Sequence, residues 1–174
     1  QWQKDGTSIS GATSTSYTIA SAQSDDNGSY QCIVSNKYAS ATSNSAALLV
    51  GYAPAIDIQP VSADQVAGSS VTFSISLSAG STPLSYQWQK DGADISGANS
   101  ASYSIASLTT DHNGSYRCIA SNPFGTVASN AATLTVGVTP VVPSQPVNQN
   151  AIVGTSPTFT VTATGTAPLS YQWL

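Results

Sequence analysis

The sequence predicts an all-β fold of tandem β-sandwiches, with one complete domain flanked by two half-domains. Three observations predict it. Apolar and polar residues alternate over short segments, strand-favouring residues outnumber helix formers, and the chain repeats itself at an offset of 86 residues. Alternation with a period of two puts every second side chain on one face of a strand, where β-branched and aromatic residues pack well. A chain of 174 residues is long enough for a sizeable core.

The internal repeat sets the domain organisation. Gln1–Gly6 recurs unchanged as Gln87–Gly92, and more than half of residues 1–51 are identical to residues 87–137. Tyr171–Trp173 begins the same pattern again, one residue short of the offset. Self-similarity at a fixed period is the mark of a tandem array, so we expect three consecutive units.

The middle unit, residues 52–137, is predicted to be complete. Alternation and turn residues predict strands near residues 55–59, 70–78, 84–90, 94–96, 102–106, 115–121 and 126–136. Residues 1–51 contain only the counterparts of the later strands, and residues 138–174 only those of the earlier ones. Half of a sandwich exposes an apolar face and unpaired edges. Two alternatives follow: the chain is a window on a longer polymer, which we favour, or its two ends complete one another between chains.

A spacing of aromatic and sulfur residues identifies the kind of sandwich. Trp88 is followed after 30 residues by Cys118, with Tyr116 two residues before the cysteine. The first unit repeats this spacing with Trp2, Tyr30 and Cys32. The pattern resembles the immunoglobulin superfamily, specifically the I-set-like tandem repeats of large bacterial surface or secreted proteins.

The resemblance implies roles for these residues. The tryptophan is expected to fill the space between two sheets, the tyrosine to tie the preceding corner to the backbone, and the cysteine to face the core. In the strand letters of that family, residues 1–51 hold strands C to G and residues 138–174 hold strands A to C. The expected structural core residues are Trp2, Trp88, Trp173, Tyr30, Tyr116, Cys32, Cys118, Ile75 and Val161.

The chain departs from the disulfide-bonded members of that family. Their second cysteine corresponds here to Ile75 in the middle unit and to Val161 in the last. The resemblance therefore implies that the inter-sheet disulfide is missing. We expect Cys32 and Cys118 to be buried thiols that act as small apolar side chains, with a reactive or interchain thiol as the alternative.

Composition and residue types exclude several functions. The net charge is −4, and nucleic acids and anionic membranes require clusters of Lys and Arg, so neither is an expected partner. No apolar run approaches the roughly 18 residues of a membrane-spanning helix, so no membrane insertion is expected. His112 is the only histidine and the chain has no Glu, which leaves no triad or metal-ligand set. We expect no catalytic site, metal or cofactor.

These features favour a non-catalytic structural repeat of an extracellular or cell-surface fibre, stalk or adhesin. Its partners would be neighbouring immunoglobulin-like repeats or identical chains joined head to tail, and such a contact would build a filament. The alternative is a carbohydrate- or protein-binding accessory module of a secreted enzyme. Tyr38 and Phe124, at matching turn tips, are possible contact residues, and packing between adjacent domains is the favoured role. The chain begins with Gln1 and no export signal, so we expect that this is not a natural start.

Overall fold

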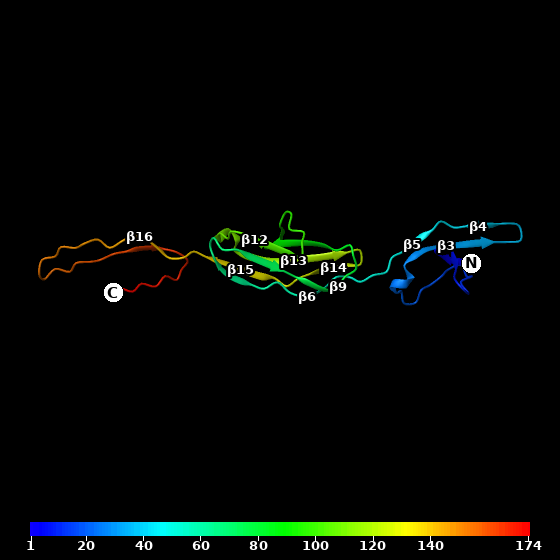
Figure 1. Cartoon of the computed structure of the whole chain (residues 1–174), viewed down its shortest axis with the longest axis horizontal. Coiled ribbons are helices and arrows are strands. Elements are labelled where there is room, and N and C mark those ends of the chain that lie inside the picture. Colours follow the sequence, from blue (N-terminus) through cyan, green and yellow to red (C-terminus); the bar gives the residue numbers. More distant parts are fainter.

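The computed structural model describes all residues 1–174 and confirms the all-β prediction. Residues 1–50, 52–137 and 138–174 follow one another along a single long axis (Figure 1). The only helical segments are two three-residue 3-10 turns, η1 (Ser24–Asp26) and η2 (Thr110–His112). Neither is long or apolar enough to cross a membrane.

The middle unit is a sandwich of two layers. The first layer has the strand order β11-β10-β13-β15-β7, with β14 also paired to β13. The second layer consists of the pairs β12–β8 and β6–β9. In chain order the strands are β6 (Ala55–Ile58), β7 (Ala63–Val66), β8 (Val71–Ser74), β9 (Ser76–Ala79), β10 (Ser85–Lys90), β11 (Ala93–Asp94), β12 (Ser102–Ile105), β13 (Gly114–Asn122), β14 (Gly125–Ala128) and β15 (Ala132–Gly137).

Two predicted strands are each divided in the structure. The strand expected at residues 70–78 is interrupted at Ile75, because β8 pairs with β12 whereas β9 pairs with β6. The strand expected at residues 126–136 is interrupted over residues 129–131. Within this break the Ser129 hydroxyl accepts from Cys118 N at 2.9 Å and donates to Asn130 O at 2.8 Å. A buried serine therefore replaces ladder hydrogen bonds where the strand changes its contact with β13.

Strand β7 was not predicted from the sequence. Its residues, Ala63–Val66, include Asp64 and Gln65 and lack the apolar alternation of the other strands. It forms because the backbone pairs in parallel with β15, placing Ala63 opposite Leu134. Backbone pairing at a sheet edge needs no apolar side-chain pattern, so this strand leaves little trace in the sequence.

An aromatic cluster fills the space between the two layers of the middle unit. Trp88 lies opposite Cys118 in the β10–β13 ladder, and both are 0% exposed. Phe73 from β8 stacks on Tyr116, with ring centroids 4.8 Å apart, and lies 6.2 Å from the centroid of Trp88. The Trp88 indole N–H donates to Ser100 O at 2.9 Å. The cluster is thus densely packed and its buried polar atom has a partner.

The two flanking units contain fewer strands. Residues 1–50 form β1 (Trp2–Lys4), β2 (Thr7–Ser8), β3 (Gly28–Ser35), β4 (Ser40–Thr42) and β5 (Ala46–Leu48). Trp2 lies opposite Cys32, which is the register of Trp88 and Cys118. Residues 138–174 form only β16 (Val141–Ser144) and β17 (Thr162–Thr164), paired antiparallel with a register shift.

Substitution of Trp88 by Ala is expected to destabilise the middle unit by about 3–5 kcal/mol, because a large ring is removed from a closed core. Far-ultraviolet circular dichroism during urea unfolding would measure the loss. Trp173→Ala is the matched control, since the Trp173 side chain is 54% exposed and should change stability little. Equal effects of the two substitutions would contradict the packing described here.

Candidate functional site

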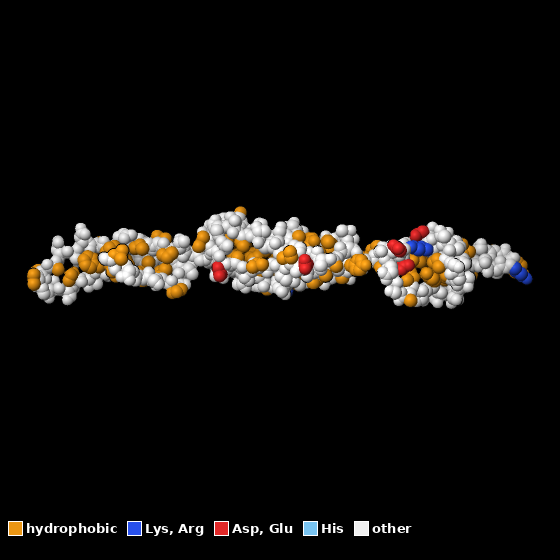
Figure 2. All heavy atoms as spheres, turned by 60° about the horizontal axis from the view of Figure 1, so that its bottom comes forward, with side chains coloured by type: hydrophobic (Ala, Val, Ile, Leu, Met, Phe, Trp, Pro, Cys, Tyr) orange, Lys and Arg blue, Asp and Glu red, His pale blue; other side chains and the backbone are white.

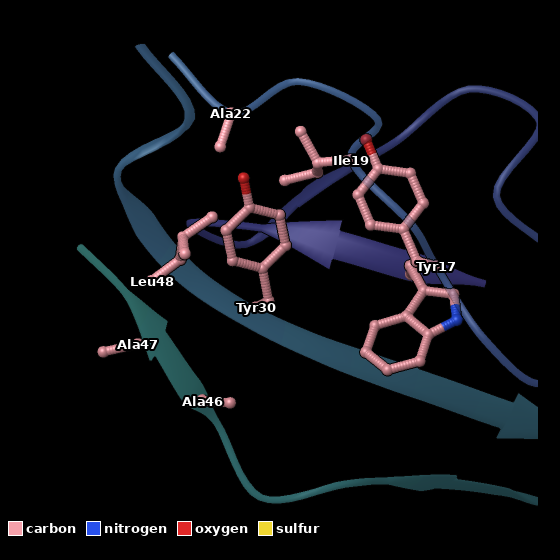
Figure 3. Close-up of a pocket in the computed structure, with 8 residues that line it drawn as sticks. Tyr17, Ile19, Ala22, Tyr30, Ala46, Ala47 and Leu48 are labelled. Atoms are coloured by element: carbon pink, nitrogen blue, oxygen red, sulfur yellow. The ribbon is translucent and has the colours of Figure 1, made fainter. Parts of the chain in front are cut away.

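An open apolar cavity lies on the inner face of residues 1–50. Its volume is about 340 Å³. Every side chain around it is apolar or aromatic, and the rings of Tyr17 and Tyr30 lie side by side at its centre (Figure 3). The lining residues are Trp2, Tyr17, Ile19, Ala22, Tyr30, Ala46, Ala47 and Leu48. The polar side-chain atoms of this lining are the Trp2 indole nitrogen, which donates to Ser14 O, and two tyrosine hydroxyls, of which Tyr30 OH donates to Asp26 O. The remaining lining is apolar and suits an apolar side chain.

The aromatic rings of this cavity have the arrangement found in the middle unit. The centroid distances are 6.5 Å between Trp2 and Tyr17 and 6.2 Å between Tyr17 and Tyr30. The corresponding rings, those of Trp88, Tyr103 and Tyr116, are 6.4 Å and 6.2 Å apart. The middle unit has Phe73 against these rings, whereas residues 1–50 contain no phenylalanine. The cavity therefore has the tryptophan and tyrosine arrangement of the middle core.

The matching ring is exposed at the other end of the chain. Phe159 stands 86 positions after Phe73 and is 51% exposed. Its centroid lies 6.4 Å from that of Trp173, close to the 6.2 Å between Phe73 and Trp88. Trp173 was expected in a core but is 54% exposed, and it lies outside any strand. Val161, the counterpart of Ile75, is half-buried.

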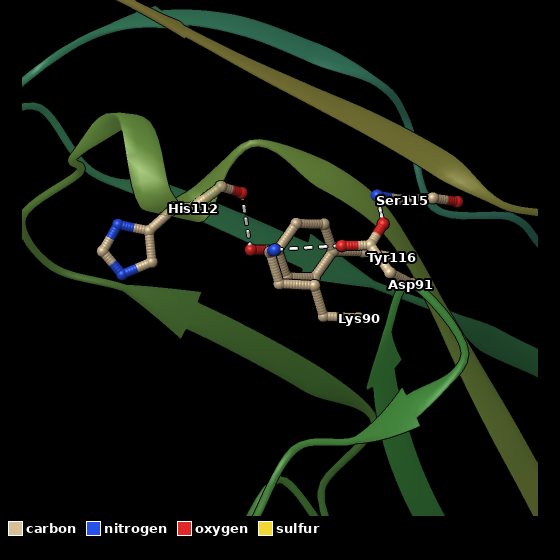
Figure 4. Close-up of polar contacts among 5 residues, drawn as sticks. All are labelled: Lys90, Asp91, His112, Ser115 and Tyr116. Atoms are coloured by element: carbon tan, nitrogen blue, oxygen red, sulfur yellow. Dashed lines mark hydrogen bonds and ion pairs between the residues drawn. The ribbon is translucent and has the colours of Figure 1, made fainter.

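The two corner tyrosines make equivalent hydrogen bonds. Tyr116 OH donates to His112 O at 2.8 Å (Figure 4). Tyr30 OH donates to Asp26 O at 2.8 Å. Burial raises the pKa of Tyr116 to about 12, so the hydroxyl keeps its proton and donates. The acceptors are backbone oxygens, which explains why Asp and His can alternate at this position.

The side chain of His112 has a structural contact that the sequence analysis did not identify. Its Nδ1 accepts from Thr109 N at 2.9 Å at the start of η2. In the first unit, Asp26 Oδ2 accepts from Gln23 N at 2.8 Å in the same way. The signal was present in the sequence as a polar residue three positions after Thr109 and Gln23, the spacing of a capping box.

Asp91 links the turn after β10 to the start of β13. Its Oδ1 accepts from Ser115 N at 2.8 Å and its Oδ2 pairs with Lys90 Nζ at 2.9 Å (Figure 4). These two contacts, the backbone hydrogen bond first, lower the pKa of the Asp91 carboxyl. Asp5 repeats the first contact by accepting from Ser29 N at 2.8 Å.

The two cysteines are free thiols in different surroundings. Cys118 is fully buried in the middle unit, and burial raises the pKa of its thiol to about 11. Cys32 has the same place in the first unit but is only partly buried, because its face of the sheet is open. Ile75 and Cys118 belong to the same buried cluster.

Tyr38 and Phe124 differ in their surroundings although their turns match. Tyr38 is 82% exposed, and Lys37 Nζ lies 4.7 Å from the centre of its ring. Phe124 is half-buried against the linker that precedes the middle unit. No group of three or more His, Cys, Asp or Glu side chains is placed to hold a metal ion.

Comparison with known proteins matches each of the two larger parts of the chain to a family model. Residues 1–50 and residues 53–122 each match a family model described as an immunoglobulin domain. The cell adhesion molecule DSCAML1 of Mus musculus is 36% identical over 106 residues, which cover 56% of this chain and 5% of that protein. Roundabout homolog 3 of Homo sapiens is 27% identical over 187 residues, covering 99% of this chain and 13% of that protein.

A solved structure of Sidekick-1 immunoglobulin domains 1-5 aligns with 78% of this chain and 32% of that chain, at 23% identity and a TM-score of 0.47. The chain spans only 5% and 13% of the two relatives named above. Its domains resemble those of cell adhesion molecules over that short span.

The two thiols are expected to differ in reactivity. Cys32 should react with iodoacetamide in the native chain, whereas Cys118 should react only after unfolding, because it is buried and its raised pKa keeps it protonated. Mass spectrometry of peptides after timed alkylation at pH 8 would measure both rates. Fast labelling of Cys118 in the native chain would show that the core of the middle unit is open.

Stability of the middle unit is expected to depend on the charge of Asp91. A lowered carboxyl pKa stabilises the fold above the pKa of the unfolded chain, ordinarily 3.8, and this contribution disappears as the pH falls through the folded pKa. Asp91→Asn should therefore melt at a lower temperature than the wild type at pH 7, and the difference should close below pH 3.8. Asp57→Asn, on an exposed strand position, is the control. A difference that stays constant with pH would exclude this role.

Proposed function

We propose that this chain, which is built of tandem immunoglobulin-like domains, is a non-catalytic structural segment of an extracellular or cell-surface adhesion protein. Its consecutive domains would act as spacers. The resemblance to cell adhesion molecules and the arrangement of three units along one axis support this role (Figure 1). Few charged side chains interrupt the surface, which suits a hydrated, weakly interacting rod (Figure 2).

The proposal includes head-to-tail assembly of identical chains, and one observation carries it. Residues 1–50 have an apolar cavity that lacks a ring, and residues 138–174 expose Phe159 at the equivalent position of the repeat. In the middle unit the same rings are packed together within one domain. The Phe159 segment of one chain would therefore supply to the next chain what β8 supplies within residues 52–137.

Such a composite domain contains one tryptophan too many. Trp2 and Trp173 are both counterparts of Trp88, and only one indole fits the central position. Trp2 is the one retained, because it is held opposite Cys32 in the β1–β3 ladder and its indole N–H donates to Ser14 O at 3.0 Å. Trp173 lies outside any strand and is displaced.

The relatives named above are animal proteins. They give no support to a bacterial surface or to a filament, both of which stay predictions from the sequence. A ligand-binding role in a secreted enzyme also stays a prediction, because no relative or site described above favours it.

Phe159→Ala is expected to prevent association of the chain. Burial of a phenylalanine ring contributes about 1.5–3 kcal/mol, and its loss also leaves the cavity open. Analytical ultracentrifugation over a range of concentrations would show a rising mass for the wild type and a constant monomer mass for the variant. Trp173→Ala is the matched control and should associate as the wild type does.

Protection of Cys32 supplies an independent measurement. Its rate of alkylation should fall with concentration in the wild type, because the open face becomes covered, and should stay constant in Phe159→Ala. A wild-type chain that remains monomeric, with Cys32 equally reactive at all concentrations, would rule out head-to-tail assembly. The proposed spacer role does not depend on that result.

A further inference from the structure

The linker between the first unit and the middle unit is held by side chains of both units. In the first unit, Asn27 Oδ1 accepts from Val50 N, and Asn27 Nδ2 donates to Val50 O at 3.3 Å. In the middle unit, Tyr52 N donates to Ser81 Oγ and Ser81 N donates to Tyr52 O, both at 3.0 Å. Gly51 is the one residue between these two sets of hydrogen bonds.

The turn between β13 and β14 adds a further contact to the same linker. Asn122 Nδ2 donates to Tyr52 O at 2.7 Å and to Ser81 O at 2.8 Å. The Oδ1 atom of this amide accepts from the backbone N–H groups of Phe124 and Gly125, at 2.9 and 3.1 Å. One amide therefore fixes the shape of the turn and also binds the turn to the linker.

Gly51 itself is covered by the ring of Phe124. A Cβ atom added at Gly51 would lie 2.4 Å from Cε2 of the ring and 2.7 Å from Ser81 Oγ. The φ angle of Gly51 lies outside the left-handed region, so packing rather than backbone conformation excludes a side chain here. A glycine ordinarily makes a linker flexible, but at this position the ring fills the space that backbone rotation would need.

The turn approaches the linker through a glycine of its own. A Cβ atom added at Gly125 would lie 3.0 Å from the Cβ of Ala53. Each backbone therefore has a glycine where the other presents a side chain, with Gly51 against Phe124 and Gly125 against Ala53. The turn and the linker are complementary in shape as well as hydrogen-bonded.

Parts of this arrangement recur at the second junction of the chain. Asn113 Oδ1 accepts from Val136 N at 2.5 Å, so the residue before the junction glycine is held at both junctions. After the glycine, Val138 N donates to Thr166 Oγ1 at 2.6 Å and Thr166 N donates to Val138 O at 2.9 Å. These are the same two bonds that hold the first linker to the middle unit.

We propose that the Gly51 junction is a rigid joint, held closed by Asn122 and Phe124, that fixes the direction of the first unit relative to the middle unit. Only Gly51 lies between the residues that the two units hold, and the Phe124 ring blocks its rotation. All of these contacts lie within one chain, so the joint is independent of head-to-tail assembly. It goes beyond the proposed spacer role, because a spacer with flexible joints would separate domains without giving them a common direction.

Hydrogen exchange at the amides of Tyr52 and Ser81 measures opening of the joint, and nuclear magnetic resonance resolves each amide. Asn122→Ala should speed exchange at both about tenfold or more, because two hydrogen bonds between the turn and the linker region are lost. Asn36→Ala is the matched control. Asn36 makes the same pair of turn hydrogen bonds in the β3–β4 hairpin, away from the linker, so its loss should leave both rates unchanged (Figure 1).

Residual dipolar couplings measure whether the direction is fixed. In the wild type, residues 1–50 and 52–137 should fit one alignment tensor, because a rigid joint makes them reorient together. Gly51→Ala should reduce the alignment of the first unit relative to the middle unit, since the added methyl group displaces Phe124 or Ser81. In a flexible linker, alanine would instead stiffen the chain. Gly125→Ala should have a smaller effect, because its Cβ would lie 3.0 Å rather than 2.4 Å from the nearest atom.

Separate alignment tensors in the wild type, or unchanged exchange in Asn122→Ala, would overturn the joint and leave the proposed spacer as a flexible one. The amide of Trp88, which donates to Ala98 O at 3.0 Å, shows whether a variant has lost its core. If Asn122→Ala also speeds exchange at Trp88, Gly51→Ala decides. Reduced alignment of its first unit would support the joint, and a single tensor for both units would overturn it.

Discussion

The packing of one phenylalanine against a tryptophan and a tyrosine is the interaction on which the other features depend. In the middle unit Phe73 crosses from one layer to meet Trp88 and Tyr116 on the other, and the surrounding core is closed. Where the ring is missing, the remaining aromatics keep their spacing but line an open cavity. The spacing between the tryptophan and the two tyrosines therefore does not depend on the phenylalanine. In the middle unit, the ring of Phe73 fills the remaining space between the layers.

Backbone acceptors make the corners of the repeat tolerant of sequence change. Tyr30 and Tyr116 both donate to a carbonyl oxygen, so the side chain at that residue is free to cap the neighbouring 3-10 turn. An aspartate performs this in one unit and a histidine in the other. The single histidine therefore caps a 3-10 turn through its side chain.

Much of the fold was predictable because strand periodicity and the Trp, Tyr and Cys spacing are local signals. Strands β10 and β12 lie within the predicted ranges, and β13 extends its range by one residue at each end. Strand β7 was missed because edge pairing needs no apolar pattern, and the division at Ile75 was missed because it depends on which partners lie alongside. The side-chain amide of Asn122 donates to the backbone oxygens of Tyr52 and Ser81. The sequence does not predict this contact, because both acceptors are backbone atoms. The only sign of it in the sequence is the asparagine repeated at position 36.

Replacement of the second cysteine by Ile75 has a mechanical consequence. Both thiols are free, so no covalent bond shortens the path between the ends of a unit. If tension unfolded the middle unit, the chain could extend to its full contour length. The 86 residues of this unit, at roughly 3.3 Å each, give roughly 280 Å. A disulfide between the positions of Ile75 and Cys118 would keep about half of that length inside a closed loop. Refolding of the middle unit would therefore require no disulfide to form again.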